Sequence, residues 1–293
     1  GRKFSGIKNG ASPQWLQDRL KEIGLRPISA LVDVTNYMTH AFGRPLHVYD
    51  AAKLTGNLTA RMAAEGETFT ALDDKEYTAS GSEVVIADGA GAQGFGGVIG
   101  GLDTGCGEGT TEVVLEAALF DPVRTAFTGR DQGLITDARY RFERGVDPLF
   151  IRDGIEIATR MILEFCGGEV SHVFEAGADT VWDRTVPFRS ERVKTLGGVD
   201  LPAVESVAIL EKLGFGVEGN DPYTVAVPSW RCDVVGEPDL VEEVLRIHGY
   251  DNIPSVALPA ADHKAGTTLS SRQKRARAVK RRLAGVGKIG RAS

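Results

Sequence analysis

Histidine, hydroxyl and amide side chains occur close together in the first fifty residues, in a pattern that could bind or activate a small molecule. His47 lies two residues after Pro45 and three before Asp50. The pair Thr35-Asn36 comes earlier, with Asn36 eleven residues before His47. An imidazole transfers protons near neutral pH, while hydroxyl and amide groups orient a substrate. A lone histidine is more often structural, so this spacing by itself favours a structural role and leaves a catalytic one open.

A single carboxylate, Glu116, interrupts an apolar run over residues 113–120. If this run is a strand, Glu116 points to the same face as Val114 and Ala118. A carboxylate facing an apolar pocket needs a partner or takes up a proton, which makes Glu116 a candidate for recognising a ligand. The alternative is that Glu116 ends the strand at a rim.

Four acidic residues near the C-terminal end form a candidate cation site: Asp233, Asp239, Glu242 and Glu243. The last three lie at i, i+3 and i+4 of a helix expected over residues 238–247, so they share one face. Clustered carboxylates repel one another, and Mg²⁺, which prefers oxygen ligands, would offset that repulsion. Acidic residues in a first helical turn also complement the helix dipole without a ligand, so the chemistry favours neither interpretation.

A glycine-rich segment over residues 95–101 lacks both the Gly-Lys-Ser/Thr of a phosphate-binding loop and the G-x-G-x-x-G turn of a dinucleotide site. A nucleotide site is therefore not indicated. Because glycines let a backbone approach a ligand closely, the segment is expected to form the wall of a small-molecule pocket.

Periodicity places these groups on a chain that mixes helices and strands. Helices are expected from Pro13 to Gly24, with Ser12 as the cap, and over residues 147–165, 202–213 and 238–247. Residues 28–38 are rich in β-branched side chains and favour a strand, as do 46–50 and 224–227. Short alternating segments at 58–61, 68–72 and 84–87 are typical of antiparallel strands.

We therefore predict an α+β protein in three parts. Residues 1–178 form a domain with a mixed or antiparallel sheet, and residues 179–258 form a small α+β domain. Residues 259–293 form a linker and the start of another domain. From residue 263 onward there are ten basic residues and no acidic ones, which we interpret as a solvated first helix rather than an RNA-binding arm.

Composition excludes several classes of protein. With 34 Lys and Arg against 40 Asp and Glu, the net charge of −6 argues against a whole-surface polyanion binder. No apolar run reaches the length of a membrane helix, and the first residues lack the apolar core of a signal peptide, so we expect no membrane partner and a cytoplasmic location. The three cysteines are widely spaced and indicate neither a disulfide framework nor a zinc site.

Several of these strings, taken together, closely resemble the bacterial phenylalanine–tRNA ligase beta subunit. The editing module of that family is similar to residues 26–37, 44–50, 97–101 and 139–148, in the same order and spacing. Residues 228–233 and 239–250 are similar to the small domain that follows it. The resemblance covers nearly the whole chain and implies an internal piece of a longer subunit, with the basic tail as the first helix of a catalytic-like domain.

The resemblance implies an enzyme that charges tRNA(Phe) with phenylalanine using ATP, with the synthetic site on an absent alpha subunit of an α2β2 tetramer. A pocket shaped for phenylalanine rejects tyrosine poorly, so a second site must hydrolyse Tyr-tRNA(Phe). By the resemblance, Glu116 would accept a hydrogen bond from the tyrosine hydroxyl. The other implied site residues are His47, Thr35 and Asn36 near the ester, Gly97 at the approach of the terminal adenosine, and Thr136 and Ala138 in the amino-acid pocket.

The resemblance also favours Mg²⁺ at Asp233, Asp239, Glu242 and Glu243, beside the alpha subunit. No Ser-His-Asp or Cys-His nucleophile is evident, so a positioned water is the expected attacking group, assisted by a tRNA hydroxyl. The competing interpretation is a non-catalytic module for tRNA binding and subunit assembly. A free-standing hydrolase is a third, which the small domain argues against.

Overall fold

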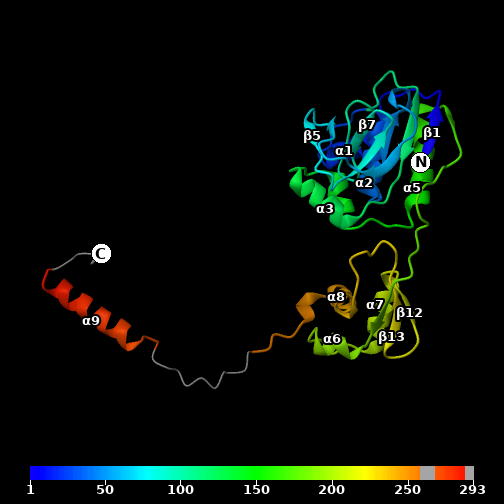
Figure 1. Cartoon of the computed structure of the whole chain (residues 1–293). Helices are drawn as coiled ribbons and strands as arrows, with labels where there is room; N and C mark the ends of the chain where they lie inside the picture. The colour runs from blue at the N-terminus through cyan, green and yellow to red at the C-terminus, as the bar shows by residue number, and fades with distance from the viewer. Residues whose placement is uncertain (258–267, 288–293) are drawn as a thin grey trace. The chain divides into compact units, whose positions relative to one another are not determined.

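The first part of the chain is built on a four-stranded antiparallel sheet, seen in a computed structural model that describes residues 1–257 and 268–287 (Figure 1). Its strand order is β10-β1-β9-β2, so β9 lies between β1 and β2. The strands are β1 (Arg2–Ser5), β2 (His47–Asp50), β9 (Glu112–Glu116) and β10 (Glu169–Val170). A short 3₁₀ helix, Ala51–Lys53, follows β2. The predicted strand at 46–50 is confirmed.

Three helices pack with this sheet around one hydrophobic core: α1 (Gln14–Glu22), α2 (Ala30–Ala41) and α5 (Ile151–Cys166). The strand predicted over residues 28–38 is wrong, because residues 30–38 belong to α2. Its buried Leu31, Val34 and Met38 recur at helical spacing. β-Branched residues lower helix propensity only slightly, so burial of one face decides the structure.

Helix α1 begins without the serine cap that the sequence suggested. Pro13 occupies the N-cap position, and the Ser12 hydroxyl instead donates to the buried carboxylate of Asp33 at 2.5 Å. Asp33 also accepts from the backbone N–H of Ile28 at 2.9 Å. The serine thus satisfies a buried charge of α2 rather than the end of its own helix.

A second antiparallel sheet, of order β3-β6-β7-β8, and a β4–β5 hairpin share another hydrophobic core. The strands are β3 (Thr59–Met62), β4 (Thr68–Thr70), β5 (Glu76–Thr78), β6 (Val84–Asp88), β7 (Gly91–Phe95) and β8 (Ile99–Gly100). The antiparallel strands predicted here are confirmed. Two helices that the sequence patterns did not reveal follow β9: α3 (Pro122–Asp131) and α4 (Asp137–Phe142).

Residues 185–252 form a separate three-stranded antiparallel sheet and its helices. The strand order is β11-β13-β12, with β11 (Thr185–Phe188), β12 (Gly216–Glu218) and β13 (Tyr223–Ala226). The helices are α6 (Glu191–Thr195), α7 (Ala203–Lys212), α8 (Glu237–His248) and the 3₁₀ helix Tyr250–Asn252. Their apolar side chains form a third core. Helices and antiparallel sheets together confirm the predicted α+β class.

The chain divides into two compact units, Gly1–Asn252 and Ile253–Ser293. The second unit contains α9 (Ser271–Gly285). Ser270 and Gln273 form a capping box at the N-terminus of this helix. The domain boundary predicted after residue 178 stays a prediction, and the one between 258 and 259 lies outside the described residues. Within the described ranges, no helix is both long and apolar enough to cross a bilayer.

The buried guanidinium of Arg44 connects three segments of the first part of the chain. Arg44 is 1% exposed and lies between α2 and β2. It donates to the carbonyl oxygen of Ala118, after β9, at 2.9 Å, and to that of Asp147, before α5. Burial lowers the pKa of Arg44 to about 10, so it remains charged at neutral pH. Gly154 leaves space for this side chain, since a Cβ there would lie 3.1 Å from Arg44 Cγ.

We predict that Arg44→Met lowers the free energy of unfolding by about 2–4 kcal/mol, because methionine fills similar space but leaves two part-buried carbonyls without a donor. Urea unfolding followed by circular dichroism measures the change. Arg160→Met, on the exposed side of α5, is the matched control and is expected to shift stability by less than about 0.5 kcal/mol. Equal, small shifts in both variants would show that the Arg44 hydrogen bonds are not needed.

Candidate functional site

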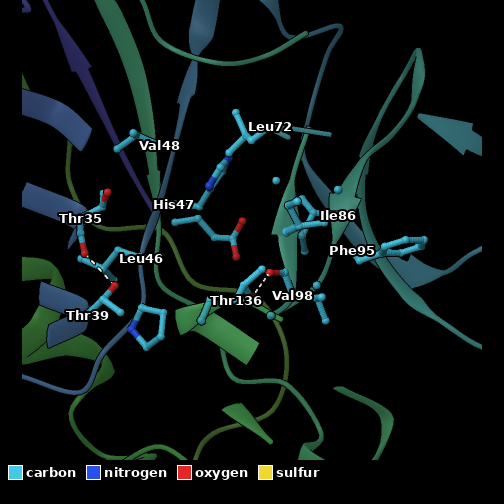
Figure 2. Close-up of a pocket in the computed structure, with 18 of the residues that line it drawn as sticks. Thr35, Thr39, Leu46, His47, Val48, Leu72, Ile86, Phe95, Val98 and Thr136 are labelled. Atoms are coloured by element: carbon cyan, nitrogen blue, oxygen red, sulfur yellow. Dashed lines mark hydrogen bonds between the residues drawn. The ribbon is translucent and has the colours of Figure 1, made fainter. Parts of the chain in front are cut away.

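One cavity of about 460 Å³ brings together every residue that the sequence analysis considered for catalysis or substrate binding. Its walls come from α2, β2, β9, the β7–β8 segment and the start of α4. Figure 2 shows Thr35, His47 and Thr136, from three of these elements, around it. The full set of lining residues from that analysis is Thr35, Asn36, His47, Gly97, Glu116, Thr136 and Ala138.

The register between β2 and β9 places three polar side chains on one face of the sheet. His47 lies directly opposite Glu116, and Tyr49 lies opposite Val114. Because side chains alternate along a strand, His47 and Tyr49 share a face, and Glu116 reaches both from the neighbouring strand. The Tyr49 hydroxyl donates to Glu116 Oε2 at 2.6 Å, and the rings of His47 and Tyr49 meet edge to face with centroids 4.5 Å apart.

Glu116 is a half-buried carboxyl group with no cation within ion-pair distance among the described residues. Burial raises its pKa above the ordinary value of 4.5, and the hydrogen bond from Tyr49 opposes that shift. Burial also raises the pKa of Tyr49, which is 2% exposed, and the nearby Glu116 charge acts in the same direction. In this pair the phenol is the donor and Oε2 of Glu116 is the acceptor.

His47 presents a neutral imidazole at the cavity. Its Nε2 is buried and has no hydrogen-bond partner in the described part of the chain. Burial lowers its pKa to about 4. Gly100 makes room for the ring, because a Cβ there would lie 2.3 Å from His47 Cε1. An unpartnered imidazole nitrogen on a cavity wall can accept or donate one proton or orient a water molecule.

Thr35 and Asn36 reach the cavity from α2. The Thr35 hydroxyl donates to the carbonyl of Val32 at 2.8 Å, and the Thr39 hydroxyl donates to the carbonyl of Thr35 at 2.8 Å, as Figure 2 shows for the latter. The side-chain amide of Asn36 makes no hydrogen bond with the residues that the structure describes, so both its donor and its acceptor are available to a ligand.

Gly97 and Thr136 have structural roles that the sequence did not indicate. Gly97 has φ +72°, and a Cβ there would lie 2.8 Å from the ring of Phe120. The Thr136 hydroxyl donates to the carbonyl of Val98 at 2.6 Å and accepts from the N–H of Arg139 at 3.1 Å, capping α4. Thr136 thereby fixes the wall of the cavity near Ala138, and its hydroxyl has little capacity left for a ligand.

The glycine-rich segment does form a wall, since Gly94, Gly96, Gly97 and Gly100 all line the cavity. The sequence patterns did not single out Tyr49, although its position two residues after His47 places both on one face of a strand. Cys106 also lines the cavity, and burial raises the pKa of its thiol to about 12. A thiol that stays protonated is a poor nucleophile, so this cysteine does not supply one.

The four acidic residues of the predicted metal site do not converge on a cation. Asp233 pairs with Arg231 at 2.6 Å, and Glu243, 6% exposed, pairs with Arg231 at 2.7 Å and with Arg246 at 2.6 Å. Asp239 accepts from the N–H groups of Val235 and Gly236, at 2.8 and 2.9 Å, at the start of α8.

Hydrogen bonds from Arg231 hold the pKa of Asp233 below its ordinary value, and those from Arg246 and Arg231 do so for Glu243. Glu242 is exposed. Among the described residues no three His, Cys, Asp or Glu side chains are grouped to hold a metal ion. This donor set does not fit Mg²⁺, because arginines already supply the compensating charge that sequence reasoning assigned to a cation.

We predict that lowering the pH from 7 to 5 costs this chain about 2 kcal/mol of stability through His47 alone. The pKa is about 4 in the folded chain against 6.5 for an ordinary histidine. Between these values the unfolded chain binds more protons, so acid favours unfolding. Urea unfolding at both pH values, for the wild type and His47→Gln, measures the difference; equal pH dependence in the two proteins would contradict a buried neutral imidazole.

We also predict that Mg²⁺ does not stabilise this chain specifically, since Asp233, Asp239 and Glu243 are already satisfied by arginine or backbone N–H groups. Thermal unfolding in MgCl₂ is expected to match that in NaCl of equal ionic strength. A saturable rise of the midpoint with Mg²⁺ that Glu243→Gln abolishes would overturn this expectation.

Comparison with known proteins identifies related domains along the chain. The B3/4 domain family matches residues 1–167, and the tRNA synthetase B5 domain family matches residues 186–250. A solved structure, an N-terminal fragment of the phenylalanyl-tRNA synthetase beta subunit from Pyrococcus horikoshii, aligns with a TM-score of 0.40 and 15% identity, over 85% of this chain and 71% of that one.

Curated relatives align along nearly the whole chain. The phenylalanine–tRNA ligase beta subunit of Rhodospirillum rubrum is 54% identical over 292 residues, which are 99% of this chain and 36% of that protein. Those of Paramagnetospirillum magneticum and Mesorhizobium japonicum are 50% and 52% identical, over 99% and 97% of this chain and 36% and 35% of their own lengths. The chain thus spans about a third of the length of these relatives. It belongs to the phenylalanine–tRNA ligase beta subunit family.

Proposed function

We propose that this chain carries the editing site of a phenylalanine–tRNA ligase and hydrolyses tyrosine that has been wrongly attached to tRNA(Phe). The observation that supports this most strongly is Glu116, a carboxyl acceptor that forms no ion pair with the described residues and lies on the wall of a cavity of about 460 Å³. A tyrosyl side chain that enters this cavity can donate its hydroxyl to Glu116. A phenylalanyl side chain leaves the carboxylate without that bond.

A site that hydrogen-bonds the substrate hydroxyl discriminates tyrosine from phenylalanine better than a site that only accommodates the ring. A hydrogen bond to a charged group contributes about 1.5–3 kcal/mol, equal to roughly 10- to 150-fold in rate or affinity. Desolvation of Glu116 by a phenylalanyl ring adds a penalty for the wrong substrate. The synthetic site faces the opposite difficulty, since an apolar pocket rejects an added hydroxyl only weakly.

The residues around the cavity suggest how the ester bond is hydrolysed. His47 offers a neutral imidazole with an unpartnered Nε2, and Asn36 offers a free amide. The Thr35 hydroxyl is engaged by its own helix, and the Cys106 thiol stays protonated. In this proposal the attacking group is therefore a water molecule, which Nε2 of His47 and the Asn36 amide orient toward the ester carbonyl.

In the proposed setting the chain acts in the cytoplasm as part of a complete ligase. The alpha subunit holds the synthetic site and uses ATP, and tRNA(Phe) brings its charged end to the cavity. The proposed hydrolysis gives no role to Asp239 or Glu243, which bond to backbone N–H groups and to arginines respectively.

The test is hydrolysis of Tyr-tRNA(Phe) and Phe-tRNA(Phe) by this chain and by the complete ligase that contains it. Wild-type protein is expected to release tyrosine selectively, and Glu116→Ala is expected to lower the ratio of kcat/KM for the two esters by about 10- to 100-fold. Glu112→Ala, on the same strand but ion-paired with Lys3, is the matched control and should leave the ratio unchanged.

Two results would overturn the proposal. One is an unchanged ratio in Glu116→Ala, which would remove the carboxylate from recognition. The other is the absence of tyrosine release from both this chain and the complete ligase, which would leave a non-catalytic module for tRNA binding and assembly.

A further inference from the structure

The hydrogen bond between Tyr49 and Glu116 is a feature of the cavity that hydroxyl recognition by itself does not require. The phenol is 2% exposed and donates to Oε2 at 2.6 Å. No other hydrogen bond reaches the Glu116 carboxylate from the described residues. One oxygen of the carboxylate is thus held by the protein, while the other has no partner within the part of the chain that the structure describes.

The surroundings restrict Tyr49 to this arrangement. Its ring packs edge to face against His47, with centroids 4.5 Å apart, and His47 in turn packs against Gly100. The backbone of β2 is fixed by pairing with β9 over all four residues of the strand. A hydrogen bond from a buried and immobilised ring costs little conformational entropy, so it defines the rotamer of Glu116 more strictly than a mobile donor would.

We propose that Tyr49 is a positioning residue, whose hydroxyl holds one oxygen of Glu116 and leaves the other for the hydroxyl of a tyrosyl substrate. This inference rests on the editing function proposed above and names a second residue that sets its specificity. Without the Tyr49 hydroxyl, the Glu116 carboxylate is no longer held in one rotamer. Ordering it when the substrate binds then costs conformational entropy, which weakens the binding of the tyrosyl group.

The same contact has a competing explanation. The Tyr49 phenol bonds Glu116 as a bound tyrosyl phenol would, so it could act as a resident competitor for the carboxylate. The two explanations predict opposite effects when the hydroxyl is removed. A positioning role predicts weaker selection of tyrosine, whereas a competitor predicts stronger selection.

The decisive variant is Tyr49→Phe in the complete ligase, because it removes one oxygen atom and keeps the ring that packs on His47. We expect kcat/KM for Tyr-tRNA(Phe) to fall about 10-fold and that for Phe-tRNA(Phe) to change less than about twofold. Tyr223→Phe in β13 is the control, since it also removes one phenol oxygen, and Tyr223 packs against the core of the small domain and does not line the cavity. It should leave both values unchanged.

A double-mutant cycle separates positioning from general damage. If Tyr49 acts through Glu116, Tyr49→Phe should have no further effect on the ratio of the two esters in a Glu116→Ala background. A purely structural role would lower hydrolysis of both esters equally and would persist in that background.

Each outcome bears on the inference. Suppose that the wild type hydrolyses Tyr-tRNA(Phe). The role of Tyr49 is then overturned if Tyr49→Phe leaves the kcat/KM ratio of the two esters unchanged, increases it, or lowers both values equally. The editing function stays intact in each of these cases. When the wild type of the complete ligase releases no tyrosine, the editing function fails and the role of Tyr49 fails with it.

Discussion

The pairing register of β2 with β9 determines which groups meet in the cavity. A shift by one residue would turn His47 and Tyr49 to the opposite face of the sheet from Glu116. The register is strongly constrained because the other side of both strands contributes Val48, Val113 and Leu115 to the core beneath. Burial of those three apolar side chains therefore also places the polar groups, which links the stability of the sheet to the chemistry of the site.

Around this pair of strands, buried polar groups fix the rest of the wall. Arg44 connects the approach to β2 with the end of β9 and the start of α5, and Thr136 ties the start of α4 to the carbonyl of Val98. Gly97 and Gly100 allow Phe120 and His47 to pack where a Cβ would collide. These contacts enclose the cavity, and among the described residues Asn36, His47 and Glu116 retain hydrogen-bonding capacity toward it.

The sequence predicted the elements that depend on local signals and missed those that depend on partners distant along the chain. Alternation and turn residues revealed the antiparallel strands, and the glycine-rich segment was correctly expected to line a pocket. Residues 28–38 were misjudged because their composition favours a strand, while burial of one helical face against α5 decides the outcome. The hydrogen bond of Ser12 to Asp33 spans 21 residues and has no local signature.

The same limit explains why Glu116 and the acidic residues of the small domain, which the sequence presented as two candidate binding sites, differ in the structure. Asp233 and Glu243 lie beside guanidinium groups, which hydrogen-bond to their oxygens and lower their pKa values. Glu116 accepts a hydrogen bond from the phenol of Tyr49, and burial raises its pKa, while that bond and the positive charge of the N-terminus act in the opposite direction. The phenol is an uncharged partner, so it orients the carboxyl group without forming an ion pair. Such a group keeps an oxygen free for a hydroxyl, whereas an acid paired with arginine does not.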